Sequence, residues 1–68
     1  MSTDRSTWFK GTYLGSTEKA WRIHFDGEDA PRWIPRSDRV VYDITVNLEV
    51  GKPVDVEIAE WFVEKEGL

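Results

Sequence analysis

The segment from Lys19 to Ser37 constrains the fold most, because it has the pattern of a β-hairpin. Its first part alternates apolar Trp21, Ile23 and Phe25 with polar residues, and an unbroken period of two is typical of a strand with one buried face. Residues 26–36 then supply a turn rich in Asp, Gly and Pro, followed by a short return strand. We therefore expect the rest of the chain to pair with this hairpin as a sheet.

The return strand presents a choice of which side chains face the core. Trp33 alternates with Arg32, Ile34 and Arg36. If Arg32, Ile34 and Arg36 pointed inward, two arginines would be buried, which is unfavourable unless both find partners. We therefore expect Trp33 to point inward, unless Pro35 lies on a bulge that resets the alternation.

The remaining pattern predicts three further strands and one helix. The strands are expected over Trp8–Leu14, Arg39–Val46 and Val54–Ile58, with one face of the second carrying Val40, Tyr42, Ile44 and Val46. Gly11 marks a bulge or a close backbone approach. From about Ile58 or Ala59 to Glu66 the apolar spacing becomes helical, and Gly67 is placed to end the helix. The predicted fold class is α+β, mostly β: a strongly bent antiparallel sheet of four or five strands, with one short C-terminal helix on its concave side.

Residues 8–68 are expected to form one small domain, and residues 1–7 a disordered polar tail. A chain of this size buries only about 60% of the surface that its unfolded form exposes. Cys is absent and His24 is the only histidine, so we expect no disulfide, no metal site and no cofactor. Aromatic packing and self-association remain as sources of stability.

The location and the partners are constrained by hydropathy and charge. No apolar run approaches the roughly 20 residues of a membrane span, so we expect a cytoplasmic protein with no membrane partner. The net charge is −4, but residues 1–39 hold seven Lys and Arg against six Asp and Glu, whereas residues 40–68 hold two against seven. An acidic total disfavours strong non-specific binding to nucleic acid, yet this asymmetry allows one mildly basic face.

That basic face is the main candidate site, placed on the solvent side of the hairpin. Its predicted nucleic-acid-binding residues are Arg22, His24, Arg32, Arg36, Lys10 and Arg39, with Trp8 as a further candidate. Guanidinium groups and exposed rings on a sheet are what single-stranded nucleic-acid binders use. A plain solvated sheet face explains the same residues. His24 lacks a nucleophile and a motif around it, so no catalytic residue is expected.

Trp61 and Phe62 are the candidate residues for self-association. They point about 100° apart on a helix, so one can fill the core while the other reaches a neighbour. We expect a homodimer with one of them at its centre, because Trp is frequent in interface hot spots. The acidic residues of the C-terminal half offer a different surface, which could imitate nucleic-acid phosphates towards a basic partner.

Two motifs carry a resemblance to a known group of proteins. Trp33-Ile34-Pro35-Arg36-Ser37, followed later by Glu60-Trp61-Phe62 and an ending at Lys65-Glu66-Gly67-Leu68, resembles small phage and prophage proteins with a W-[ILV]-P-[KR]-S segment and a C-terminal E-W-[LF]-x-x-K-x-G-L helix. The similarity covers most of residues 12–68. Its element order is similar to the coactivator-type single-stranded-DNA-binding fold, which dimerises through its helix. The resemblance implies a phage-encoded protein in a bacterial host, and some proteins of this general kind act as anti-CRISPR or other anti-defence factors.

We therefore expect a non-enzymatic binding module from a phage or other mobile element. Its expected partner is single-stranded or distorted nucleic acid, bound on the sheet face that carries the arginines. The alternative is an anti-defence inhibitor of the anti-CRISPR type, which would bind a host defence protein through its acidic helix.

Overall fold

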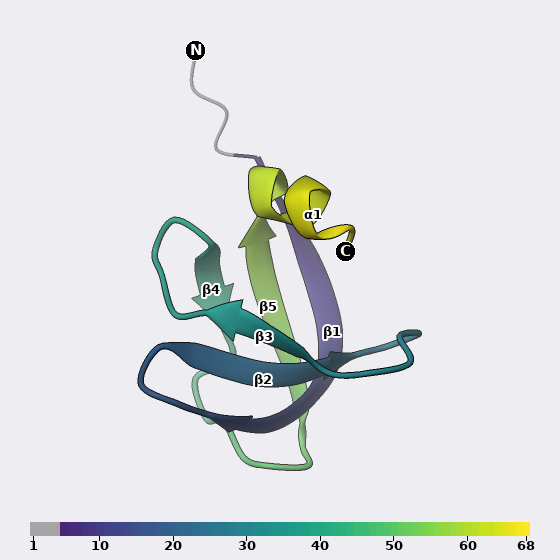
Figure 1. Ribbon diagram of the computed structural model, residues 1–68. Helices are drawn as coiled ribbons and strands as arrows, with labels where there is room; N and C mark the ends of the chain where they lie inside the picture. Colours follow the sequence, from purple (N-terminus) through teal and green to yellow (C-terminus); the bar gives the residue numbers. More distant parts are fainter. Residues whose placement is uncertain (1–4) are drawn as a thin grey trace.

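The computed structural model describes residues 5–68 and shows five antiparallel strands followed by one helix (Figure 1). The elements are β1 (Ser6–Ser16), β2 (Ala20–Phe25), β3 (Arg32–Pro35), β4 (Val41–Ile44), β5 (Pro53–Ala59) and α1 (Glu60–Glu66). This confirms the predicted fold class, a mostly β protein with one short C-terminal helix. All five predicted strands are present, although β4 is shorter than expected.

The strand order is β3-β2-β1-β5-β4, with the long strand β1 at the centre. Because every neighbouring pair is antiparallel, β3 and β4 run in the same direction along the sheet. Parallel neighbours need a crossover of about a dozen residues or more, and only residues 36–40 join these two strands. The sheet therefore curls without closing, and β3 and β4 remain as its edges.

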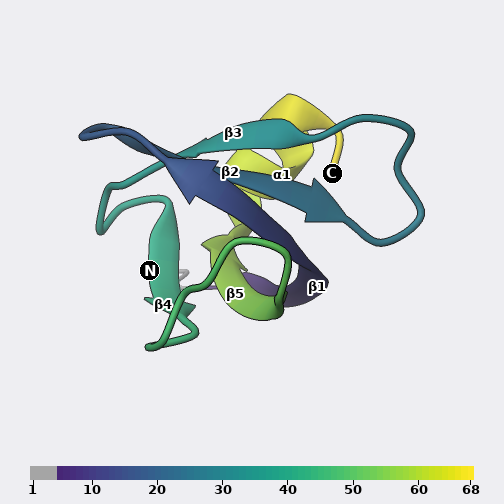
Figure 2. The ribbon, with the colours of Figure 1, turned by 90° about the horizontal axis from the view of Figure 1, so that it is seen from below.

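β1 serves both halves of the sheet, because it pairs with β5 through residues 6–12 and with β2 through residues 11–16. The two sets of partners overlap at Gly11 and Thr12. At Gly11 a Cβ atom would lie 2.5 Å from the carbonyl oxygen of His24. The close backbone approach expected at Gly11 is thus confirmed, while the bulge of this strand lies between Tyr13 and Gly15. Viewed from below, β2 and β3 lie on one side of β1, and β5 and β4 on the other (Figure 2).

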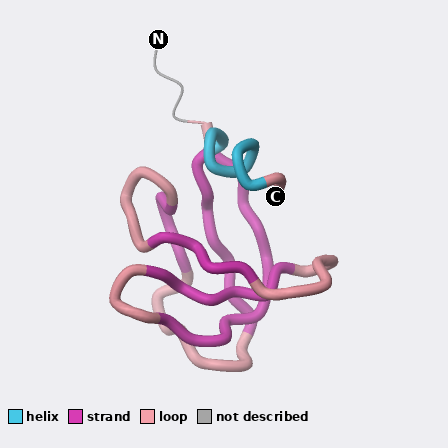
Figure 3. The backbone as a smooth tube through the Cα atoms, in the orientation of Figure 1, coloured by secondary structure: helices cyan, strands magenta, loops and turns pink. Residues whose placement is uncertain are grey.

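The core fills the inner side of this bend. Its largest fully buried side chains are Ile23, Ile34, Val54, Val56 and Ile58. The helix α1 lies at one end of the sheet (Figure 3) and adds Phe62 to the same cluster. Gly67 ends the helix in the left-handed conformation at φ 72°, and its N–H donates to the carbonyl of Val63, as its position in the sequence predicts. The core thus draws on both halves of the sheet and on the helix.

The prediction that Trp33 faces the core is wrong. Trp33 is 53% exposed, whereas Ile34 is 1% exposed and packs in the core. The argument failed because β3 is only four residues long, so the arginines at its ends reach the rim of the core instead of its centre. At the rim, Arg32 stays half-buried with a carboxylate partner, and Arg36 stays exposed.

The face predicted for the fourth strand is also partly wrong. The register shifts between Val41 and Asp43, so the strict alternation does not hold there. Val41 is buried and Tyr42 is exposed, although the alternation grouped Tyr42 with the buried Val40. A bulge of this kind inserts a residue into the ladder. Here it leaves both Tyr42 and Asp43 on the outside, while Ile44 packs against the core as the alternation predicts.

The prediction of a disordered tail over residues 1–7 has a different outcome for its two parts. Residues 1–4 lie outside the part of the chain that the structure describes. For Ser6 and Thr7 the prediction is wrong, because they belong to β1 and pair with Ala59 and Ile58. Their pairing places the start of the strand next to the start of α1.

Replacing Gly11 with alanine tests the close approach at the centre of the sheet. The added Cβ would press on the backbone of β2, and overpacking of this kind typically lowers the free energy of unfolding by about 1–3 kcal/mol. Lys10→Ala, at an exposed position of the same strand, should change the free energy of unfolding by about 0.5 kcal/mol or less. Urea denaturation followed by circular dichroism measures both values. Equal stability of the two variants would contradict the proposed contact.

Candidate functional site

The outer face of the sheet is organised around β1, where alternate residues point away from the core. Trp8, Lys10 and Thr12 form this outward row, since the residues between them either face the core or approach β2. Beyond Thr12, the sheet continues to His24 on β2, and beyond Trp8 it continues to Glu57 on β5. The two halves of the outer face carry different side chains.

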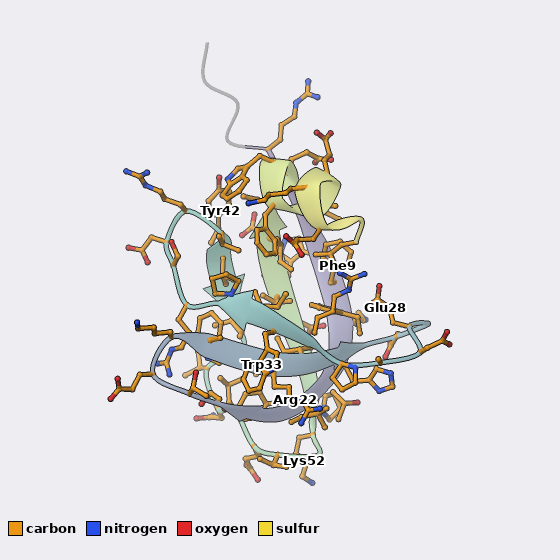
Figure 4. All side chains as sticks on the ribbon, in the orientation of Figure 1. Phe9, Arg22, Glu28, Trp33, Tyr42 and Lys52 are labelled. Atoms are coloured by element: carbon orange, nitrogen blue, oxygen red, sulfur yellow. The ribbon has the colours of Figure 1, made fainter. Side chains whose placement is uncertain are left out.

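The first half, here called the β2–β3 surface, consists of Lys10, Arg22, His24 and Trp33. Arg22 and Trp33 are directly opposite each other in the β2–β3 ladder. The guanidinium carbon of Arg22 lies 5.8 Å from the centre of the Trp33 ring, and Figure 4 shows the two side chains next to each other. This is the distance of a cation–π contact. The contact presents an exposed indole and a guanidinium group together to solvent.

His24 lies on the same surface but is tied to the neighbouring loop. Its Nε2 atom is 2.7 Å from the carbonyl oxygen of Glu28, which can only accept, so Nε2 carries the proton and donates. The ring is half-buried. His24 therefore positions the turn after β2.

The other predicted basic residues do not share this surface. Arg32 and Arg36 lie at the inner rim of β3, on the opposite side of the strand from Trp33. The guanidinium carbon of Arg36 is 5.2 Å from the centre of the Trp21 ring, and its Nη1 donates to the carbonyl of Thr17 at 3.1 Å. Arg39 lies in the β3–β4 connection. Of the six residues predicted to form one basic face, the structure brings together Lys10, Arg22 and His24.

Arg32 links three parts of the molecule at that rim. Its Nε donates to Oε1 of Glu28 at 2.6 Å, and its Nη1 donates to the carbonyl of Glu66 at 3.1 Å. The hydrogen bond from Arg32 lowers the pKa of the Glu28 carboxyl below its ordinary value. The β2–β3 loop, β3 and the end of α1 are therefore held together by one guanidinium group.

Sequence reasoning missed Trp33 as a surface residue, although a signal for it was present. Glu28 precedes Arg32 by four residues across a turn, a spacing that let the two side chains pair. A partner for Arg32 removes the main objection to placing Ile34, and not Trp33, in the core. Once Ile34 points inward, Trp33 and Arg22 must share the outer face.

The second half of the outer face, here called the β4–β5 surface, consists of Trp8, Asp43, Asp55 and Glu57. Glu57 is opposite Trp8 on one side and Asp43 on the other, so these three form a row across β1, β5 and β4. Trp8 is 55% exposed and borders a shallow hollow of about 300 Å³, which Asp43 and Asp55 also line. The outer face is thus divided into a basic and an acidic half, each with one exposed tryptophan.

The two residues predicted for self-association have different environments. Phe62 is 7% exposed and belongs to the core, so it is not available to a neighbouring molecule. Trp61 is 51% exposed, and its Nε1 donates to the carbonyl of Arg39 at 3.0 Å. The expected division between the two rings is therefore present, with Trp61 outside.

No helix within residues 5–68 is long and apolar enough to cross a membrane. No three His, Cys, Asp or Glu side chains of the same range gather where they could hold a metal ion. Comparison of the chain with protein-family models gives no match, and comparisons with curated proteins and with solved structures give no significant match either. The function must therefore be inferred from the two surfaces themselves.

Glu28→Gln tests the ionic link at the rim through its pH dependence. Because the folded-state pKa of Glu28 is lowered, its stabilising effect is present above the unfolded pKa of about 4.3 and is lost as the pH falls through the folded value. Glu28→Gln should therefore melt at a lower temperature than wild type at neutral pH, and the difference should shrink below about pH 4. Asp29→Asn, which removes an exposed charge from the same loop, is the matched control. A difference that persists unchanged at acidic pH would exclude this ionic link.

Proposed function

We propose that this protein binds single-stranded nucleic acid on its β2–β3 surface, without catalysing a reaction. The observation that carries the proposal is the half-exposed indole of Trp33 with the guanidinium of Arg22 over its ring. An exposed ring gives an unpaired base a face to stack on, and an adjacent arginine gives a phosphate or a base a cationic contact. Both groups are held by a strand pair, so the platform exists before the ligand arrives.

The shape and the charge of the surface favour a single strand over a duplex. Stacking on Trp33 requires a base that is already unpaired, because bases inside a duplex are stacked on one another. The exposed Lys and Arg side chains of this surface are Lys10 and Arg22. If these two neutralise two phosphates, the slope of log K against log salt is about −1.4. So shallow a salt dependence is expected of a protein that binds weakly and mainly by stacking. It agrees with the net charge of −4, which disfavours many phosphate contacts.

The acidic half of the outer face supports a defined path for the strand. Asp43, Asp55 and Glu57 would repel phosphates from the β4–β5 surface. Lys10 lies at the boundary, opposite Asp55 in the β1–β5 ladder. A bound strand would therefore run along β2 and β3 and end near Lys10.

Arg22→Ala and Trp33→Ala test the platform, with Arg36→Ala as a matched control. Arg36 also lies over a tryptophan, but at the inner rim of β3. With a short oligo-dT and fluorescence anisotropy, Trp33→Ala should weaken binding by about 5- to 150-fold, the range expected for one lost stacking contact. Arg22→Ala should weaken binding and reduce the steepness of the salt slope by about 0.7. Arg36→Ala should bind as wild type does.

Two results would contradict the proposal. If Arg36→Ala weakens binding as much as Arg22→Ala, the β2–β3 surface is not the site. If wild type shows no binding to oligo-dT even at low salt, the protein is not a single-strand binder. The inhibitor that binds a host protein would then be the remaining function to test.

A further inference from the structure

The carboxylates of the β4–β5 surface form no ion pair within residues 5–68. In that range the one ion pair is between Glu28 and Arg32, on the far side of the sheet from these groups. Asp43 accepts a hydrogen bond from the N–H of Ile44, and Glu57 accepts one from the hydroxyl of Ser6. These hydrogen bonds come from neutral donors, and Lys10, opposite Asp55 in the β1–β5 ladder, is the neighbouring cation at the boundary of this surface, so the three carboxylates together keep a net negative charge.

An arginine side chain is the group that fits this surface best. Its flat guanidinium can stack on the exposed indole of Trp8 while its N–H groups donate to a carboxylate in a forked arrangement. The hollow beside Trp8 is open and is bordered by Asp43 and Asp55, which places acceptors on one side of the ring. A lysine would supply the charge but not the flat surface.

The chain itself presents such an arginine. Arg22 is exposed on the β2–β3 surface, where it is already stacked on Trp33 and points away from the core. The two surfaces of one molecule cannot meet each other, because β1 separates them and the bend of the sheet turns them apart (Figure 2). Each molecule therefore carries two complementary surfaces that face different directions. One is basic and the other is acidic, and each has an exposed tryptophan.

We propose that a second copy of this chain docks its β2–β3 surface onto the β4–β5 surface of the first, head to tail. Such an interface is heterologous, so each molecule keeps one free surface of each kind and short chains of molecules can grow. A chain of 68 residues has a small core, and contacts between copies are one of the usual ways in which small domains gain stability. The proposed interface does not depend on the proposed function. One consequence does depend on that function: oligo-dT and a second copy of the chain would compete for Arg22 and Trp33.

Two variants, each with one surface altered, test this arrangement. Arg22→Ala alters the basic surface, and the double variant Asp43→Asn, Asp55→Asn alters the acidic one. All three positions are exposed or half-exposed, so the fold should be kept, as far-UV circular dichroism checks. In sedimentation velocity at low salt, the mass of wild type should rise with concentration beyond that of a dimer. Each variant alone should remain monomeric.

The decisive measurement is an equimolar mixture of the two variants. One interface can form between them, from the intact basic surface of the double variant and the intact acidic surface of Arg22→Ala. The mixture should therefore form a heterodimer and grow no further. Trp61→Ala serves as the control for a dimer centred on the helix, and it should associate as wild type does.

Several outcomes would overturn the head-to-tail interface. The interface is excluded if wild type stays monomeric at every concentration. It is also excluded if either variant associates with itself in the absence of the other. Loss of association in Trp61→Ala would assign the contact to α1 instead. These experiments contain no nucleic acid, so their failure is separate from failure of the oligo-dT binding, which is measured on dilute, monomeric protein. Added oligo-dT should shift associated wild type back towards monomer.

Discussion

The structure depends on the close contact between β1 and β2 at Gly11. At this residue one strand is paired on both sides, with β5 and with β2, and the backbone of His24 comes too near for any side chain. The contact lets a single strand pass from one half of the sheet to the other while keeping its ladder bonds. A small sheet bent in this way can surround a core that a flat sheet of the same length would leave exposed.

The bend leaves two edges that cannot pair, and the chain protects them in different ways. β3 begins at Arg32 and ends in Pro35, which lacks an N–H, and Arg36 follows directly after it. Arg32 joins this edge to the last turn of α1 through the carbonyl of Glu66. β4 is short and irregular in register. Short, charged or irregular edges discourage unwanted strand addition, which leaves the outer face as the larger surface for recognition.

Charge is divided across that outer face because of which residues the strand ladders bring opposite each other. The rows that cross β2 and β3 bring Arg22 to Trp33, and the rows that cross β5 and β4 bring Glu57 to Asp43. A protein with a net charge of −4 thereby keeps a local basic surface. Both proposals made for the molecule follow from this division, since one uses the basic half alone and the other uses the two halves on different copies.

Local patterns were sufficient to predict much of the fold. The period of two over β2, the shift to helical spacing near Ala59 and the glycine after α1 each depend on residues close in sequence, and each is found in the structure. The separation of Phe62 from Trp61 also follows from helix geometry alone. Of the predicted site, Lys10, Arg22 and His24 share a face, because the alternation of β1 and β2 holds from Trp8 to Thr12 and from Trp21 to Phe25.

Tertiary structure decided the rest. The direction of Trp33 depended on where Arg32 could find partners: Glu28 lies four residues earlier and is a local partner, whereas the carbonyl of Glu66 reaches Arg32 only after the chain has bent. The direction of Tyr42 depended on a bulge between two strands. The sequence by itself determined which segments are strands and helix, because backbone preference and side-chain period are local. Which aromatic rings meet solvent was set by the curvature of the whole sheet, because burial depends on every strand at once.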